Sequence, residues 1–314
     1  RLTPERFRAP GFSHQVTLGQ LSRPRLRAAP LLRVRFHGEP PPGPLKWRGP
    51  ALERFDGRRW WSPPDPGERL AASEGVVKLA ENRQLWRTGR RMLYEVRLGD
   101  LASDALYLAG TPEFLRINAP AVVRTASGEY RLGSGTAEGL RYGACTFVEP
   151  GRGREAEPGG PSARTPSCCL ELPRLDPRIA ELARQVTMGL GPAEARAEAL
   201  EQHLQRRYAY REKSVSDRAA DPLADFLFRS RQGHCEYFAS ALAVMLRSVG
   251  IPARVVTGFQ GGVYNPVSGW QVIRASDAHS WVEAWLPDRG WTSFDPTPPQ
   301  SAPAAPSAWT RLNW

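Results

Sequence analysis

Cys235 is the residue of this chain best placed to act as a nucleophile. It lies in the sequence Gly-His-Cys-Glu-Tyr-Phe-Ala, and an apolar stripe with helical spacing follows it until Gly250 and Pro252 end the pattern. Unpaired backbone N–H groups and the helix dipole at the start of a helix favour a negative charge. They therefore favour the thiolate, the nucleophilic form of cysteine, although a lone buried cysteine often only fills space.

A histidine and an aspartate that follow in the sequence supply the partners that a catalytic thiol needs. His279 begins an alternating, strand-like segment, and Asp295 lies at the end of another one. His279 can accept the thiol proton and return it to a leaving amine, while Asp295 fixes the imidazole tautomer and stabilises the imidazolium. Together with Cys235 they are sufficient for acyl transfer through an acyl-thioenzyme. This chemistry needs no metal or other cofactor, and none is expected.

Two polar residues close to these groups have alternative roles. His234 adjoins Cys235, but neighbours on a helix point about 100° apart, so it is expected to line the cleft rather than to transfer a proton. Asp277 competes with Asp295 for the imidazole. Only two residues from His279, it is expected to serve in a turn or cap instead.

The remaining candidates would support the catalytic groups rather than react. Glu236 either contacts them or complements the dipole of the first helical turn, and Glu283 either contacts them or faces solvent from a strand. The tetrahedral intermediate also needs an oxyanion hole, to which the backbone N–H of Cys235 and one donor from an earlier segment would contribute. The candidates for that donor are Tyr208, Tyr210 and Gln232.

The segments around the three groups resemble the core of the bacterial transglutaminase-like superfamily. These segments are 233–239, 251–259, 277–285 and 290–297. The resemblance implies a papain-like fold and a catalytic triad, which a residue-by-residue match places at Cys235, His279 and Asp295. The chain departs from the family pattern at His234, where the family tends to have an aromatic residue.

A second segment narrows the resemblance. Residues 46–61, Lys-Trp-Arg-Gly-Pro-Ala-Leu-Glu-Arg-Phe-Asp-Gly-Arg-Arg-Trp-Trp, resemble the membrane-anchored protein-glutamine γ-glutamyltransferases of the TgpA type. That resemblance implies an extracytoplasmic, periplasmic or cell-envelope region of a membrane protein. It also implies a protein or peptide glutamine as acyl donor and an amine as acceptor. Two other functions stay open: a cysteine protease or deamidase with the same triad, and an envelope scaffold or binding module with little catalysis.

The composition is globular and strongly basic. Apolar residues make up 41% of the 314, including ten tryptophans, and no stretch approaches the roughly 20 apolar residues that span a bilayer. The net charge of +11 comes mostly from arginine and suits nucleic acid, anionic lipid or an anionic cell wall. The arginines are spread along the chain and no nucleic-acid-binding motif is present, so no nucleic-acid partner is expected.

Proline, glycine and the apolar pattern divide the chain into four predicted parts. Residues 1–150 carry short strand-like segments between turn signals and are predicted to form a β-sandwich-like domain. Residues 151–172 are rich in glycine, proline, arginine and glutamate, which is typical of a linker. Residues 173–298 hold the catalytic candidates, and residues 299–314 form a tail rich in proline and alanine. The strands expected in the first part are 31–36, 92–98, 105–109, 120–125 and 140–148.

The predicted catalytic part is helical before Gly250 and strand-like after it. Asp176-Pro177, Gly191-Pro192 and Asp221-Pro222 are typical of helix starts, and the cysteine helix follows them. Antiparallel strands are then expected at 254–259, 270–274, 280–286 and 291–294. A helix packed on such a sheet is an α+β architecture. It would bring together three groups that are far apart in the sequence.

The cysteines do not form a recognisable framework. Those at positions 145, 168, 169 and 235 are too few for a disulfide scaffold and show no zinc-ligand spacing. Cys168 and Cys169 are poor partners for each other because the small ring would be strained, but one of them can pair with Cys145 in an oxidising compartment. The alternative is three free thiols besides Cys235.

Iodoacetamide is predicted to label Cys235 ahead of the other three cysteines, because the helix start and His279 both favour its anion. Peptide mapping by mass spectrometry after partial labelling measures the order. Preferential labelling of another cysteine, or full activity in Cys235→Ala, would sink the assignment of the nucleophile. Activity is also expected to survive a chelator, since the mechanism uses no metal.

Overall fold

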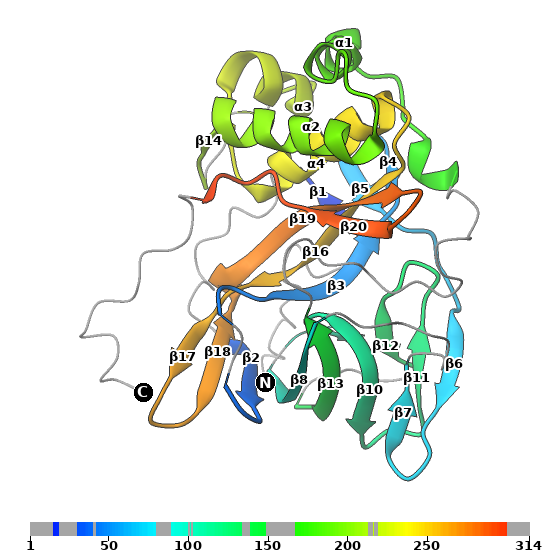
Figure 1. The fold of residues 1–314 in the computed structure, drawn as a ribbon, viewed down its shortest axis with the longest axis vertical. Coiled ribbons are helices and arrows are strands. Elements are labelled where there is room, and N and C mark those ends of the chain that lie inside the picture. Colours follow the sequence, from blue (N-terminus) through cyan, green and yellow to red (C-terminus); the bar gives the residue numbers. More distant parts are fainter. Residues whose placement is uncertain are drawn as a thin grey trace, which may run out of the picture.

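The computed structural model describes residues 15–18, 30–39, 42–79, 89–99, 101, 103–133, 139–148, 167–212, 216 and 219–299. Figure 1 shows the helices gathered at one end of the molecule, with most of the strands at the other. Most of the predicted linker 151–172 and nearly all of the predicted tail 299–314 lie outside the described residues.

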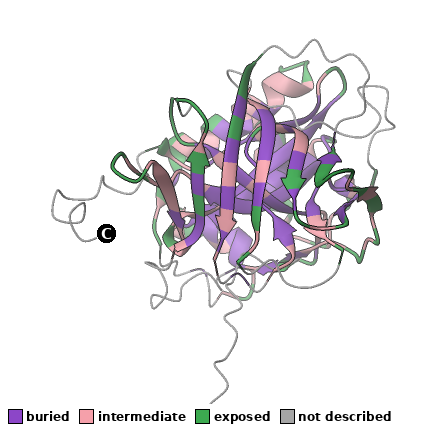
Figure 2. Ribbon diagram, turned by 90° about the horizontal axis from the view of Figure 1, so that it is seen from below, coloured by how far each residue is buried: buried purple, intermediate pink, exposed green. Residues whose placement is uncertain are grey.

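The largest sheet is antiparallel, with the strand order β17-β18-β2-β8-β13-β10-β7. Its strands are β2 (Pro30–Phe36), β7 (Val76–Lys78), β8 (Arg90–Leu98), β10 (Thr111–Ile117), β13 (Arg141–Val148), β17 (Val263–Asn265) and β18 (Trp270–Arg274). Along β8, Met92, Tyr94, Val96 and Leu98 are buried and the residues between them are more exposed. Because burial alternates with a period of two residues, one face of the sheet lies against a core. Figure 2 shows buried residues beside more exposed ones along the strands.

A four-stranded sheet covers that face. Its strand order is β6-β11-β12-β9. The bounds are β6 (Glu68–Ala71), β9 (Ala105–Leu106), β11 (Ala121–Arg124) and β12 (Tyr130–Leu132). Val96 and Leu115 of the large sheet share one apolar cluster with Leu106 and Val122 of the smaller one. The β-sandwich predicted for the N-terminal region is therefore confirmed.

The helices begin where the sequence predicts. They are α1 (Pro177–Val186), α2 (Ala193–Arg207), α3 (Pro222–Asp225), a π-helical segment (Phe226–Ser230) and α4 (Cys235–Ser248). The side chain of Asp176 accepts a hydrogen bond from the N–H of Arg178 at the start of α1, and Asp221 accepts one from Ala224 at the start of α3. Each caps a helix whose first residue is proline, which needs no N–H partner there.

Helix α4 is the centre of the catalytic half. Helices α1 and α2 pack on it from one side, and strands β16 (Ala253–Gln260) and β19 (Ala278–Leu286) pack on it from the other. Leu242 and Leu246 of α4 share an apolar cluster with Val255 and Val282 of the strands. This is the predicted α+β arrangement.

The sheet under α4 has the order β20-β19-β16-β3, so its last strand comes from the N-terminal half of the sequence. Strand β20 comprises Gly290–Phe294, and β3 comprises Lys46–Leu52. In return, hairpin β17–β18 of the catalytic half pairs with β2 in the large sheet. The domain limits stay a prediction, but hydrogen-bonded strands from both halves cross them.

A small sheet of the N-terminal half also packs into the catalytic core. Its order is β1-β5-β4, with bounds β1 (Gln15–Thr17), β4 (Arg54–Phe55) and β5 (Arg59–Trp61). Trp60 of β5 is completely buried in the cluster that contains Leu242, and its indole Nε1 donates to Ser240 Oγ at 2.9 Å. Aromatic burial with a satisfied N–H fixes this sheet against α4.

Glu283 of β19 is completely buried, so the alternative in which it faces solvent is wrong. Arg48 of β3 binds its carboxylate with two nitrogens, at 2.8 and 3.1 Å, and Arg254 of β16 donates to it at 2.7 Å. Burial opposes its ionisation, but the two guanidinium groups outweigh that effect and lower the pKa of Glu283 to about 2. The buried charge is stable because arginines from two other strands of the same sheet, β16 and β3, neutralise it.

Gly258→Ala is predicted to destabilise the protein, because the added Cβ would lie 2.1 Å from the backbone oxygen of Trp47 in the neighbouring strand. Separating β3 from β16 to make room should cost about 1–3 kcal/mol or more of unfolding free energy. Denaturant unfolding measures the loss, with Gly191→Ala as control, since a Cβ there meets nothing within 4 Å. Equal stability of the two variants would show that β3 and β16 are not so closely paired.

Candidate active site

Cys235 is the first residue of α4, and the segment before it is held in an extended conformation. His234 is the N-cap, with φ −97° and ψ 177°, and Gly233 ends the two-residue strand β15 (Gln232–Gly233). Strand β15 pairs in parallel with β14 (Ala209–Tyr210). The thiol therefore lies where the unpaired N–H groups of the helix favour its anion, and it is almost completely buried.

The structure brings His279 and Asp295 together. His279 is the second residue of β19, opposite Gly258 of β16, and its Nε2 lies 2.8 Å from Asp295 Oδ2. Since Nε2 is engaged by the carboxylate, Nδ1 remains for the thiol, and the imidazole and Cys235 each favour the charged form of the other. The structure thus brings together the three groups that the sequence nominated.

Asp295 is held on several sides. Its backbone N–H donates to Glu201 Oε1 at 2.7 Å, and Gln205 of α2 donates to its backbone oxygen at 2.7 Å. The N–H of Thr297 donates to Oδ1 at 3.1 Å, which leaves Oδ2 to the imidazole and to Lys46 Nζ at 3.1 Å. Such constraints fix the carboxylate and hence the ring that it orients.

Lys46 is a site residue that the sequence analysis did not find. It lies at the start of β3 in the N-terminal half, and its ammonium also lies 5.3 Å from the ring of Trp281, which stacks on His279. A lysine more than 200 positions from the histidine gives no local signal, because only the pairing of β3 with β16 brings it near. The resemblance of residues 46–61 to a known segment was the only available hint.

The surroundings favour a thiolate beside an imidazolium. Burial opposes ionisation of the thiol, but the neighbouring imidazoles of His234 and His279 favour the anion and lower the pKa of Cys235 to about 6. Burial also opposes protonation of His279, while the negative charge and hydrogen bond of Asp295 raise its pKa to about 9. Asp295 itself has a strongly lowered pKa, because His279 and Lys46 outweigh its burial. Between these values the charged pair predominates.

His234 lies directly before the thiol and is buried. It is the N-cap of α4 and has an extended backbone, so the 100° offset between helical neighbours does not apply to it. The ring is almost completely buried, edge-on to Tyr237 at 5.0 Å. Its Nδ1 lies 3.8 Å from Oε2 of Glu236, which is also buried. This imidazole favours the anion of Cys235, and the expectation that it does not transfer a proton stays a prediction.

Asp277 does not orient the imidazole. Its Oδ2 accepts from the backbone N–H of Arg274 at 2.8 Å and caps the 3-10 helix η6 (Ala275–Asp277), as the sequence analysis expected of a turn residue. Burial raises the pKa of Asp277.

Among the oxyanion candidates, Tyr208 is turned into the core and donates to the backbone oxygen of Leu227. Tyr210 and Gln232 lie on the β14–β15 pair beside the thiol segment.

No disulfide joins Cys145 to Cys168 or Cys169, because all four cysteines are free thiols. Cys145 lies in the large sheet, where it contacts Arg91 at 3.0 Å. Cys168 and Cys169 lie in the 3-10 helix η3 (Ser167–Leu170), with sulfurs 3.5 Å apart. The hydrogen bond from Cys169 lowers the pKa of Cys168 to about 7, which makes it the strongest competitor of Cys235 for alkylation.

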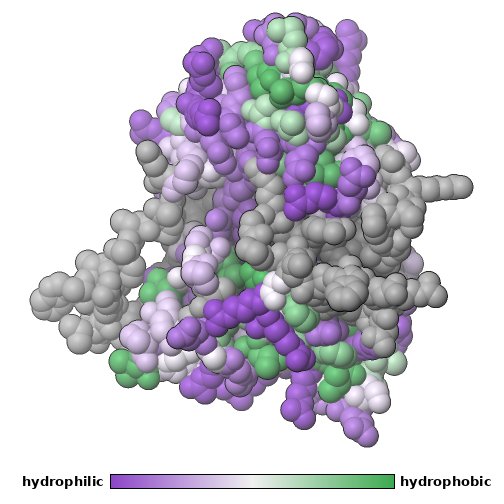
Figure 3. Space-filling view, in the orientation of Figure 1, coloured by the Kyte–Doolittle hydropathy of each residue, from purple (hydrophilic) through white to green (hydrophobic). Residues whose placement is uncertain are grey.

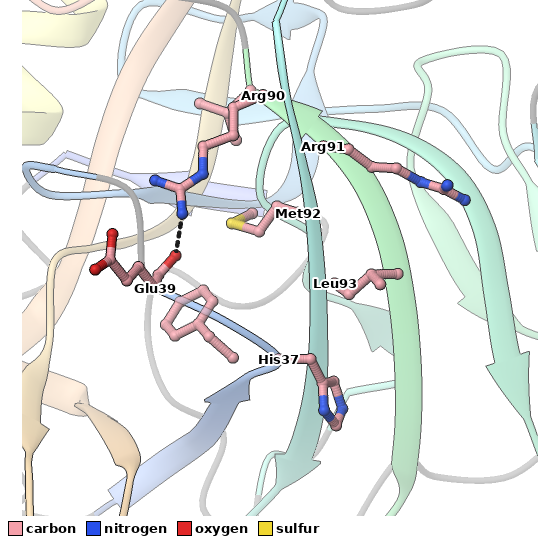
Figure 4. Close-up of a pocket in the computed structure, with 8 residues that line it drawn as sticks. His37, Glu39, Arg90, Arg91, Met92 and Leu93 are labelled. Atoms are coloured by element: carbon pink, nitrogen blue, oxygen red, sulfur yellow. Dashed lines mark hydrogen bonds between the residues drawn. The ribbon is translucent and has the colours of Figure 1, made fainter.

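A surface pocket elsewhere is unrelated to this chemistry. It lies between β2 and β8 and is lined by Phe36, His37, Glu39, Arg90, Arg91, Met92, Leu93 and Val148. Figure 4 shows that Arg90 donates across it to the backbone oxygen of Glu39, and it contains no thiol. Figure 3 shows mostly hydrophilic side chains over the helical end of the molecule.

A thiol at a helix start, an imidazole on a strand and a carboxylate at the end of the next strand define the papain-like class of thiol acyl-transfer proteins. Comparisons with known families agree. Residues 180–296 match the transglutaminase-like superfamily, and residues 4–152 match the TgpA N-terminal domain. The chain belongs to the transglutaminase-like superfamily and is of the TgpA type.

Individual relatives give the same result. The chain is 32% identical over 298 residues to a protein-glutamine gamma-glutamyltransferase of Pseudomonas aeruginosa, which covers 91% of this chain and 40% of that protein. It is 34% identical over 143 residues to protein YebA of Bacillus subtilis, covering 43% of this chain and 19% of that one. The chain thus spans less than half the length of both relatives.

A solved structure is similar over nearly the whole chain. The periplasmic domain of TgpA from P. aeruginosa superposes with a TM-score of 0.72 at 28% identity, covering 90% of this chain and 93% of that one. The resemblance stated from the sequence is therefore confirmed across both halves.

None of the helices in the described residues is both long enough and apolar enough to cross a membrane.

Asp295→Asn is predicted to fold but to lose turnover by orders of magnitude, up to about 10⁴-fold, because the amide would favour the wrong imidazole tautomer. Asp277→Asn is the matched control and should lose little, since this carboxylate only caps η6. Steady-state kinetics and circular dichroism of both variants make the comparison. If the control were the more damaged of two folded proteins, Asp295 would not be the orienting group.

The alkylation rate of Cys235 is predicted to rise around pH 6, well below the ordinary thiol value of 9.0, because its two imidazole neighbours favour the anion. His234→Phe removes one of these two imidazoles and should move this rise to higher pH. Iodoacetamide labelling of the peptide that contains Cys235, measured from pH 5 to 10, gives the titration. An unshifted curve for His234→Phe would mean that this imidazole does not stabilise the thiolate.

Proposed function

We infer that this chain is a thiol acyltransferase that transfers the acyl group of a protein or peptide glutamine to an amine. The contact between His279 Nε2 and Asp295 Oδ2, beside a thiol at the start of α4, supports this proposal most strongly. It is the arrangement that a cysteine nucleophile needs, and it lies on a transglutaminase-like core. The proposed catalytic residues are Cys235, His279 and Asp295.

The reaction has two steps on one intermediate. The thiolate of Cys235 attacks the carboxamide carbon, and the imidazolium of His279 gives its proton to the departing ammonia, which leaves a thioester. A primary amine then attacks the thioester carbon and loses a proton to His279, and the C–S bond breaks to release an isopeptide and restore the thiolate beside the imidazolium. Asp295 keeps the imidazole oriented throughout and stabilises its charged form.

The backbone N–H of Cys235 is the proposed first donor to the tetrahedral oxyanion. It lies at the start of α4, where N–H groups have no partner within the helix and where the dipole favours negative charge. Gln232 or Tyr210 is the proposed second donor, because β15 and β14 lie directly before and beside the thiol segment.

Hydrolysis on the same triad is the second candidate function. Water and an amine compete for the same thioester, so a protease or deamidase would use identical groups. The almost complete burial of Cys235 favours transfer, because it limits the access of water to the intermediate. A scaffold without catalysis is less well supported, since a decayed site would not keep Asp295 fixed by Glu201, Gln205 and Lys46.

We also propose that the chain is the extracytoplasmic region of a membrane-anchored protein. Its similarity to a periplasmic domain and the greater length of its relatives support this location. The basic surface, with a net charge of +11, suits an anionic envelope. No nucleic acid and no cofactor enter the proposed reaction.

The function is tested by intact-mass analysis after incubation with a glutamine peptide, with and without a primary amine. Transfer predicts that the peptide gains the mass of the amine minus ammonia, and that Cys235→Ala abolishes the gain. A shift to glutamate in the presence of amine would identify a deamidase, and cleavage would identify a protease. An unchanged peptide, with a Cys235 that alkylates normally, would contradict the glutamine substrate.

A further inference from the structure

Three metal-ligating side chains meet at a place that the proposed reaction does not use. Glu53, Cys168 and Cys169 each offer one donor atom, and these atoms all lie within 4.8 Å of one another. They come from the turn between β3 and β4 and from η3, segments more than 100 positions apart. The sequence analysis found no zinc-ligand spacing because the third ligand lies in the other half of the chain.

The two sulfurs have a separation that suits a shared cation. Their distance is 3.5 Å, close to the distance of about 3.8 Å between two thiolates that each lie about 2.3 Å from a tetrahedral Zn²⁺. Cys169 is completely buried against Trp285 and Trp291, whereas Cys168 and Glu53 are partly exposed. A cation can therefore enter past the two exposed ligands and be held against a buried one.

The nearest cations are engaged with other groups. Arg254 lies 3.9 Å from Glu53 Oε1, but it donates to Glu283 at 2.7 Å and stacks on the ring of Trp291. The carboxylate of Glu53 thus has only a long contact with this guanidinium. It remains available as an oxygen ligand, and the nearby positive charge offsets the net negative charge of two thiolates and a carboxylate around a divalent ion.

Arg247 holds the backbone of the cluster in place. From the last turn of α4 it donates to the backbone oxygens of Glu53, Glu171 and Ala253 at 2.6 to 2.8 Å. These bonds join both ligand-bearing segments to the catalytic helix. Arg247 is twelve residues after Cys235 on α4, a rise of about 18 Å, so the cluster is separate from the nucleophile.

We propose that Cys168, Cys169 and Glu53 bind a thiophilic divalent cation of the Zn²⁺ class, with one ligand atom from each residue. Two sulfurs and one oxygen are a ligand set that Zn²⁺ accepts, with the fourth tetrahedral position left for water. The ion would join η3 to the turn after β3. It would therefore stabilise the contact between the two halves of the sequence without taking part in acyl transfer.

The test uses Co²⁺ as a spectroscopic probe and Zn²⁺ as its competitor. The full chain with Cys235→Ala, reduced and treated with a chelator, is titrated with Co²⁺. One ion per chain with a thiolate-to-cobalt charge-transfer band is expected, and Zn²⁺ should abolish the band. Cys168→Ser and Cys169→Ser should lose it, and Glu53→Gln should weaken binding, whereas the matched control Cys145→Ser should behave as the parent.

A second measurement covers variants that fail to fold. In the unmutated chain, Zn²⁺ should slow alkylation of Cys168 and raise the unfolding midpoint, while leaving alkylation of Cys145 unchanged. Cys168→Ser should lose the Zn²⁺-dependent rise and retain acyl transfer, which separates this site from the active site. The proposal would be overturned if the parent showed no thiolate-to-cobalt band, or if the band persisted in Cys168→Ser/Cys169→Ser. Equal protection of Cys145 and Cys168 from alkylation by Zn²⁺ would also overturn it.

Discussion

The buried carboxylate of Glu283 is the interaction on which the arrangement of the catalytic half depends. A buried charge costs several kcal/mol unless it is paired, and here the two partners, Arg48 and Arg254, come from two other strands of the same sheet. Each strand must therefore keep its register for the charge to be neutralised. With that register fixed, β19 presents His279 four residues before Glu283, and β3 presents Lys46 two residues before Arg48.

This constraint makes the N-terminal half part of the active site. Strand β3 completes the catalytic sheet, and Lys46 contacts the carboxylate that orients the imidazole. Besides binding Glu283, the guanidinium of Arg48 donates to the backbone oxygens of Ser127 and Gly128 in the sandwich. The same guanidinium thus connects the sandwich, the shared strand and the strand of the histidine.

Local signals in the sequence predicted most of the elements and nominated the three candidate catalytic groups, which the structure brings together. The helix starts at Asp176-Pro177 and Asp221-Pro222 are signalled by residues adjacent in the sequence, and so is the apolar stripe after Cys235. The structure has a helix at each of these three places. The sandwich was predictable because alternation along strands such as β8 is also local. The triad could be nominated because its chemistry constrains residue types as well as their order.

Features that depend on contacts between distant segments could not be predicted. In the sequence, Glu283 does not differ from a solvent-facing polar residue of an alternating strand. Its burial is explained only by the contacts with Arg48 and Arg254, which lie far from it in the sequence. Lys46 and the grouping of Glu53 with Cys168 both follow from the path of β3, which no local pattern reveals. The orientation of His234 could not be predicted for another reason: this residue is the extended N-cap rather than part of the helix.

In the proposed mechanism, Asp295 and Cys235 keep His279 protonated, so that the thiol is an anion before substrate arrives. NMR titration of the His279 imidazole in the intact chain measures this protonation. A pKa of about 9 is expected in the parent, against an ordinary value of 6.5, with a clear fall in both Asp295→Asn and Cys235→Ala. A His279 that titrates near its ordinary value in the parent, or that is unaffected by either substitution, would contradict this mechanism.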